Sequence, residues 1–225
     1  MARKPANGKI YNKERSKQKC LDAVGKILRT EGFESLNIAK IAKAAGVDRK
    51  LIYVYFESLD ELIATYIKNT DYWQAFSDSL KELLLINKKD HGQQIATFIP
   101  QLQLEYLLNS QEVQKVVLWD LCEKNNILQE QSRKREKIIS SIFKISDPLF
   151  NPAGIDFRAI QALLIGGIYY LVLQSVSNGS PFCGININKN LDKIRINKAI
   201  EYLVNIVYRE ALSLSTTNKK DNASK

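Results

Sequence analysis

Residues 37–56 have the sequence Asn-Ile-Ala-Lys-Ile-Ala-Lys-Ala-Ala-Gly-Val-Asp-Arg-Lys-Leu-Ile-Tyr-Val-Tyr-Phe, which predicts two short helices on either side of a glycine. The side-chain oxygen of Asn37 can cap a first helix whose apolar residues, Ile41 among them, recur on one side. Gly46 tolerates the positive φ that a tight corner between helices requires, and Asp48 is placed to cap the second helix. The segment is therefore predicted to form a helix-turn-helix.

The second of these helices has the composition of a DNA recognition helix. Ile52 and Phe56 are four residues apart and can face inward, which directs Arg49, Lys50 and Tyr53 outward near the amino-terminal end. Arginine and lysine bind phosphates or guanine edges, and a tyrosine hydroxyl can donate a hydrogen bond to a phosphate. A solvated surface helix would show the same spacing, so the spacing alone leaves both interpretations open.

A longer series of motifs favours DNA binding. In chain order the motifs are Glu31-Gly32-Phe33, Ile41-Ala42-Lys43-Ala44-Ala45-Gly46-Val47, Tyr53-Val54-Tyr55-Phe56 and Glu61-Leu62. With these motifs the stretch from Leu21 to Ile63 resembles the DNA-binding domain of the tetracycline-repressor (TetR) family. By this resemblance, the residues at or beside positions that contact DNA are Asn37, Arg49, Lys50, Tyr53 and Tyr55. The resemblance also implies a ligand-responsive repressor, which binds a palindromic operator as a homodimer and is released by a small-molecule effector.

Two residues depart from the family pattern. Leu59 stands where many members carry a lysine that pairs with a phosphate, so one such contact is expected to be missing and binding to weaken uniformly. Leu51 stands where a small residue or threonine is usual. Its side chain can pack or can approach a thymine methyl group, and packing is the favoured interpretation because Ile52 already fills the inward position.

The charge distribution agrees with a DNA-binding segment at the amino terminus. The chain has 33 Lys and Arg against 24 Asp and Glu, and the first 50 residues hold 13 of the cations and 5 of the anions. Such a basic segment attached to a nearly neutral body is typical of a protein that binds nucleic acid. The cations ahead of the first family motif form either a solubility segment or an arm along the phosphate backbone: Lys4, Lys9, Lys13, Arg15, Lys17 and Lys19.

Apolar residues recur at helical spacing nearly throughout, so the fold is predicted to be all-α. We expect a helix-turn-helix domain with a basic arm over residues 1–62, a larger helical effector-binding and dimerisation domain over 63–213, and a disordered tail over 214–225. The helices expected in the larger domain are 72–86, 93–108, 112–145, 157–176 and 191–212. A kink or break is expected near Pro100, and Asp147-Pro148 and Asn151-Pro152 are expected to end the helix 112–145. The polar segments 123–126 and 133–137 indicate a bend or an exposed stretch within that helix.

The helices 157–176 and 191–212 are strongly apolar for surface elements. They could complete the core of a monomer, but the family resemblance favours pairing with the same helices of a second subunit. The residues expected at this dimer interface are Ala162, Gly166, Gly167, Tyr170, Ile196, Ile200, Leu203 and Val207.

The resemblance implies a pocket for an apolar or amphipathic effector, whose lining the sequence encodes poorly. The candidate lining residues are Trp73, Phe76, Phe98, Gln103, Tyr106, Trp119, Phe143 and Tyr169, with Glu105 and Gln174 as further polar candidates. At helical spacing a core position is the favoured interpretation for each aromatic residue among them.

Other functional classes find little support in the sequence. The amino terminus lacks the apolar run of a secretory signal, the longest apolar stretch is too short to cross a membrane, and a cytoplasmic protein is expected. Three widely separated cysteines predict neither disulfides nor a metal site, and no cofactor is expected. A single histidine, His91, and the absence of a phosphate-binding glycine loop argue against an enzyme. The alternatives are an effector-independent or architectural DNA-binding protein, and a helical binding protein or enzyme in which the helix-turn-helix is structural.

Overall fold

The computed structural model describes the backbone of residues 7–70 and 89–223, and the side chains of residues 13–70 and 89–215. Within these ranges the elements are helices, and the one strand-like feature is an isolated bridge between Phe182 and Ile185. The all-α prediction is confirmed. By compactness the described chain divides into a first unit of residues up to 70 together with 111–131, and a second unit of residues 89–110 together with those from 132 onward.

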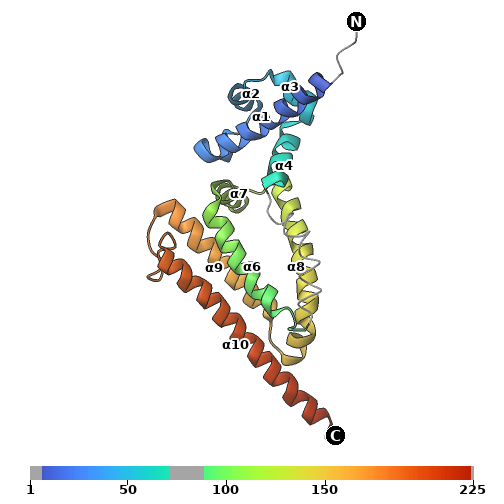
Figure 1. The fold of residues 1–225 in the computed structure, drawn as a ribbon, viewed down its shortest axis with the longest axis vertical. Coiled ribbons are helices and arrows are strands. Elements are labelled where there is room, and N and C mark those ends of the chain that lie inside the picture. Colours follow the sequence, from blue (N-terminus) through green and yellow to red (C-terminus); the bar gives the residue numbers. More distant parts are fainter. Residues whose placement is uncertain (1–6, 71–88, 224–225) are drawn as a thin grey trace. The chain divides into compact units, whose positions relative to one another are not determined.

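The first unit is a cluster of helices around one apolar core (Figure 1). Its elements are α1 (Asn7–Glu31), the 3-10 turn η1 (Phe33–Ser35), α2 (Ile38–Ala45), α3 (Arg49–Phe56), α4 (Leu59–Thr70), α7 (Gln111–Cys122) and the first turns of α8 (Asn126–Ala153). Val24 of α1, Ile41 of α2 and Ile52 of α3 are each fully buried. These side chains hold the three helices of the amino-terminal domain against one another, because each helix contributes its apolar stripe to the same core.

Residues 111–131 complete this core, although the sequence suggested that they belong to the larger domain. The ring of Trp119 on α7 stacks on Phe33 with a centroid distance of 5.4 Å and an interplanar angle of 4°. Leu128 of α8 is buried in the same cluster, and Arg29 of α1 forms an ion pair with Glu112 of α7. The compact unit that contains the helix-turn-helix therefore extends past the expected boundary at residue 62, and the functional boundary stays a prediction.

The second unit contains α6 (Gln93–Asn109), the rest of α8, α9 (Phe157–Asn178) and α10 (Asn190–Ala223). Figure 1 shows α6, α9 and α10 side by side. Phe150 and Phe157 stack at 4.2 Å, and Tyr208 meets both rings edge-on at 4.8 and 5.2 Å. Burial raises the pKa of Tyr208, so its hydroxyl stays protonated and donates a hydrogen bond to the carbonyl oxygen of His91 at 3.0 Å. This aromatic cluster fixes the packing of α8, α9 and α10.

Several expected helix boundaries were wrong. The single helix expected over residues 112–145 is two helices, because the Asn125 side chain accepts hydrogen bonds from the amides of Ile127 and Leu128 and so starts a new helix. Pro100 lies inside a continuous α6, and α8 passes through Pro148 to Ala153. A proline removes one backbone donor but does not end a helix that tertiary packing supports. Helix α10 continues to Ala223, where a disordered tail was expected, and the expected helix 72–86 lies outside the described residues.

Helix α9 is unusually apolar for its exposure. By length and composition it alone among the described helices could cross a membrane, yet only 28% of its most apolar window is buried. Leu163 is 77% exposed and Tyr170 is 52% exposed. Large exposed apolar faces of this kind are rare on soluble monomers and mark sites of association.

Candidate nucleic-acid interface

The helix-turn-helix is held by the hydrogen bonds that the sequence predicted. The Asn37 side chain accepts a hydrogen bond from the amide of Lys40 at 2.9 Å and caps α2. Gly46 follows α2 with φ = 64°, which is the left-handed conformation that favours glycine. Asp48 then accepts a hydrogen bond from the amide of Lys50 at 2.8 Å and caps α3. Capping at both starts sets the corner between the helices, and so fixes how α3 is presented.

Helix α3 is amphipathic, with a narrow buried stripe and a broad exposed face. Ile52 and Phe56 are 0% and 5% exposed, whereas Arg49 and Lys50 are exposed and Tyr53 is 54% exposed. The side chains that the sequence selected for DNA contact are thus accessible at the amino-terminal part of α3. Tyr55 differs, because it is half-buried and packs against the core of the first unit.

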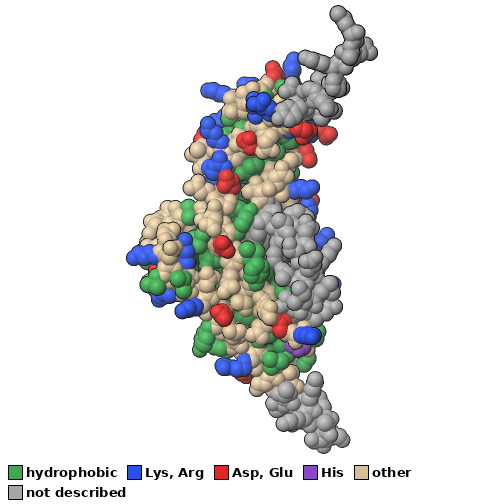
Figure 2. All heavy atoms as spheres, in the orientation of Figure 1, with side chains coloured by type: hydrophobic (Ala, Val, Ile, Leu, Met, Phe, Trp, Pro, Cys, Tyr) green, Lys and Arg blue, Asp and Glu red, His purple; other side chains and the backbone are tan. Residues whose placement is uncertain are grey.

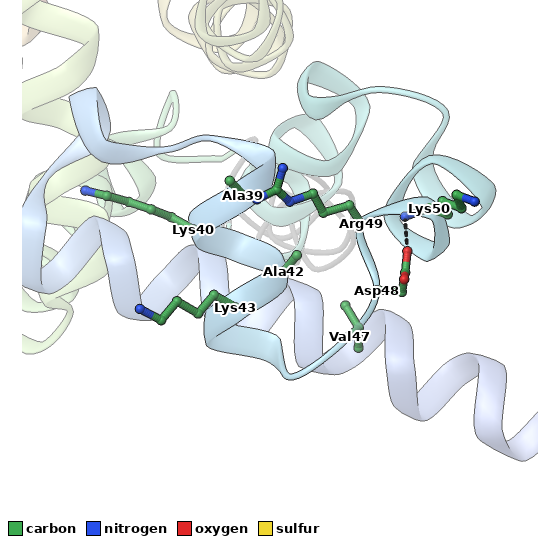
Figure 3. A pocket seen from close by; sticks show the side chains of 8 residues that line it. All are labelled: Ala39, Lys40, Ala42, Lys43, Val47, Asp48, Arg49 and Lys50. Atoms are coloured by element: carbon green, nitrogen blue, oxygen red, sulfur yellow. Dashed lines mark hydrogen bonds between the residues drawn. The ribbon is translucent and has the colours of Figure 1, made fainter.

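Cations surround this exposed face. Lys40 forms an ion pair with Glu31 at 2.7 Å, but Lys43, Arg49 and Lys50 make no ion pair within the described residues. Figure 3 shows these side chains around a shallow, open hollow between α2 and α3, with Lys50 and Asp48 on one side of it. Figure 2 shows Lys and Arg side chains over α1 to α3 on the face in view. Unpaired cations beside an accessible helix can neutralise phosphates, and their release of counterions favours DNA binding.

Asn37 is exposed, but both ends of its amide are engaged within the protein. Its oxygen caps α2, and its Nδ2 donates to the carbonyl oxygen of Ser35 at 3.3 Å. The observed role of Asn37 is to fix the start of α2, and a contact with DNA stays a prediction.

The basic segment ahead of the motifs is helical rather than an extended arm. Helix α1 begins at Asn7, so it extends well ahead of Leu21, where the family motifs begin. Lys13, Arg15 and Lys19 are exposed along this extension. The segment therefore presents these cations along a helix, which the sequence alone did not indicate.

The candidate effector residues are divided between the two units and the residues outside the described ranges. Trp73 and Phe76 lie outside the described residues. Trp119 is a core residue of the first unit, and Phe143 packs edge-on against Phe157 in the second. On α6, Gln103 is buried, Tyr106 is half-buried and Phe98 is 45% exposed; Tyr169 on α9 is half-buried.

The candidate dimer residues divide into two groups. Exposed residues are Ala162, Gly166, Gly167 and Tyr170 on α9 and Leu203 on α10, whereas Ile196 and Val207 are half-buried and Ile200 is buried within its own protomer. Ile200 is therefore a core residue and is not available to a second subunit. Three strongly exposed apolar residues on these helices were not among the candidates: Leu163 at 77%, Leu191 at 71% and Tyr202 at 65%. Leu163 and Tyr202 each lie next to a candidate residue, Ala162 and Leu203 respectively. Successive residues of a helix are rotated by about 100°, so helical spacing alone assigns a residue to a face only approximately.

The amino-terminal domain is similar to a known family of regulators. Residues 21–66 match the model described as bacterial regulatory proteins of the tetR family. The comparison with curated proteins found no match.

Among solved structures, the fatty acid degradation regulator FadR from Bacillus halodurans is 16% identical to this chain, with a TM-score of 0.56. The alignment covers 90% of this chain and 96% of that FadR chain. A proposed fatty acid metabolism regulator from Clostridium perfringens is 20% identical with a TM-score of 0.60, covering 81% and 96%. FadR from Bacillus subtilis, solved in complex with stearoyl-CoA, is 18% identical with a TM-score of 0.50, covering 83% and 96%. At these identities the likeness shows a shared fold.

Proposed function

We propose that this chain, which belongs to the tetR family of bacterial regulators through its residues 21–66, represses transcription as a homodimer on a palindromic operator and is released by a small amphipathic effector. The observation that carries the proposal is the capped α2-turn-α3 unit, which presents Arg49, Lys50 and Tyr53 as accessible groups. Such a unit positions its second helix in the major groove of DNA.

Dimerisation is supported by the exposed apolar face of α9 and α10. Leu163, Tyr170 and Tyr202 are all more than half exposed, and a Cβ added to Gly166 or Gly167 would meet nothing within 4 Å. Small residues between large apolar ones allow a second backbone to approach closely. A two-fold pairing of this face would give two recognition helices, which is what a palindrome requires.

The dimer is tested by charge substitution on this face. Leu163→Glu is expected to convert the dimer to a monomer in sedimentation velocity, because a carboxylate would be buried without a partner. Leu121→Glu is the matched control, since Leu121 is 71% exposed on α7 and lies on the other unit. A Leu163→Glu protein that sediments as the wild type does would exclude this face as the interface.

DNA binding is tested by capture and sequencing. The purified protein is mixed with genomic fragments from its source at near-physiological salt, and the retained fragments are sequenced. A shared inverted repeat that is lost with Arg49→Ala supports an operator-specific regulator. Retention without a common motif would support an architectural protein instead, since sequence-independent binding rests on phosphate contacts alone.

The effector class that we propose is a long-chain acyl thioester or a molecule of similar amphipathic character. In support of this class, helix α6 contributes the buried apolar residues Ile95, Leu104 and Leu107 and one buried amide, Gln103, to the second unit. The FadR of Bacillus subtilis, which shares the fold, is the precedent for stearoyl-CoA as the first probe.

Effector binding and operator binding must affect each other equally, because the two equilibria are thermodynamically linked. If stearoyl-CoA weakens operator binding by some factor, then the operator must weaken stearoyl-CoA binding by the same factor. Calorimetric titration of stearoyl-CoA with and without the operator duplex measures this, with free coenzyme A as the control. Binding of equal strength in both titrations would contradict release by this effector and leave DNA binding untouched.

A further inference from the structure

The outermost side chain of α3 is Val54, a residue to which the sequence analysis gave no role of its own. Val54 is 69% exposed, and no other large apolar side chain described on α1 to α4 is as exposed. It makes no contribution to the core of the first unit. A β-branched residue at an open helix position has a slightly unfavourable helix propensity, so neither packing nor local structure accounts for it.

The position of Val54 on the helix is specific. Successive residues of an α-helix are rotated by about 100°, so Val54 lies about 180° from the mean direction of Ile52 and Phe56. Since those two side chains point into the core, Val54 points directly away from it. Lys50 lies one turn earlier on the same outward stripe. If α3 enters a groove with its exposed face forward, Lys50 and Val54 reach deepest into it.

A valine at that position can make only apolar contacts with DNA. Its methyl groups form no hydrogen bond and gain nothing from a phosphate, whereas the major groove offers one apolar group, the 5-methyl of thymine. Leu51 was the earlier candidate for such a contact, but it is half-buried beside the fully buried Ile52. The accessible apolar side chain on α3 is therefore Val54 rather than Leu51.

We propose that Val54 determines operator sequence by packing against the methyl group of one thymine in each half-site, within two base pairs of the position approached by Lys50. The separation follows from the geometry, because residues one helical turn apart are about 5–6 Å from each other and base pairs are stacked about 3.4 Å apart. The proposal rests on the proposed DNA-binding function and deepens it by naming a specificity residue and the base group that it recognises.

The test replaces single atoms of the DNA. Each thymine of the captured operator is changed in turn to deoxyuridine, which removes only the 5-methyl group, and the affinity is measured by fluorescence anisotropy. For the wild-type protein, one symmetric pair of substitutions should weaken binding about fourfold per half-site, which corresponds to the burial of one methyl group. Val54→Ala should bind the thymine and deoxyuridine operators equally well at that position, and Val54→Thr, which keeps one methyl, should retain part of the discrimination.

Three outcomes separate the claims. Loss of the deoxyuridine effect in Val54→Ala, with circular dichroism unchanged, supports the assignment. An equal deoxyuridine effect in wild type and Val54→Ala overturns it, because the methyl would then be recognised by another side chain. If the wild-type protein enriches no operator at all, the proposed function fails together with this inference.

Discussion

Replacing Trp119 by alanine tests whether residues 111–131 belong to the DNA-binding unit. Trp119 is 5% exposed and stacks on Phe33, so the substitution removes both buried area and an aromatic contact. Truncation of a buried tryptophan costs about 3–5 kcal/mol, of which the stacking accounts for about 0.5–1.5 kcal/mol. Whole domains are stable by about 5–15 kcal/mol, so the loss would be a large fraction of the stability of this unit.

The measurement has to be local, because the chain has two units that need not unfold together. Hydrogen exchange followed by mass spectrometry on peptides from α1 and α2 should show faster exchange in Trp119→Ala. Leu121→Ala is the matched control, since this residue lies on the same helix but is 71% exposed and should leave exchange unchanged. Equal exchange in the two variants would refute the idea that α7 stabilises the helix-turn-helix.

Other substitutions in the same unit have defined expected effects. Gly25→Ala would place a Cβ 2.8 Å from the hydroxyl oxygen of Tyr66. The cost of overpacking, about 1–3 kcal/mol, should exceed the gain in helix propensity, about 1 kcal/mol, so the midpoint of urea unfolding should fall. The double variant with Tyr66→Phe should recover part of the loss. Gly46→Ala meets no atom within 4 Å but keeps φ = 64°, so it should cost about 1–2 kcal/mol from backbone strain alone, and Gly46→Asn should cost less in the same denaturation assay. Removing the charges of Arg15 and Lys19 together should reduce the slope of log affinity against log salt by about two if α1 follows the phosphate backbone, and an unchanged slope would exclude that contact.

Local structure was predictable from the sequence where short-range chemistry determines it. The caps at Asn37 and Asp48 and the turn at Gly46 depend on residues a few positions away, and each was confirmed. The break before α8 depends equally on a local cap at Asn125. It falls in the polar stretch 123–126, where the sequence indicated a bend or an exposed stretch of one helix rather than a new start.

Tertiary placement was less predictable, because it depends on residues far apart in the chain. The stacking of Trp119 on Phe33 joins positions in different parts of the sequence, and helical periodicity gives no information about such partners. Periodicity also assigns a helix face only approximately, which is why Ile200 was selected as an interface residue although it is buried, and why Val54 and Leu163 were passed over.

The central claim is that two recognition helices of one dimer bind the two halves of an operator. The most direct measurement compares the affinity of the wild-type protein for the intact inverted repeat and for a duplex of equal length in which one half-site is scrambled. Our account predicts a complex of two protomers on the intact repeat and an affinity at least about tenfold lower on the scrambled duplex, since specific protein–DNA contacts are lost over half of the site. Equal affinity for both duplexes, or a complex with a single protomer on the intact repeat, would contradict it.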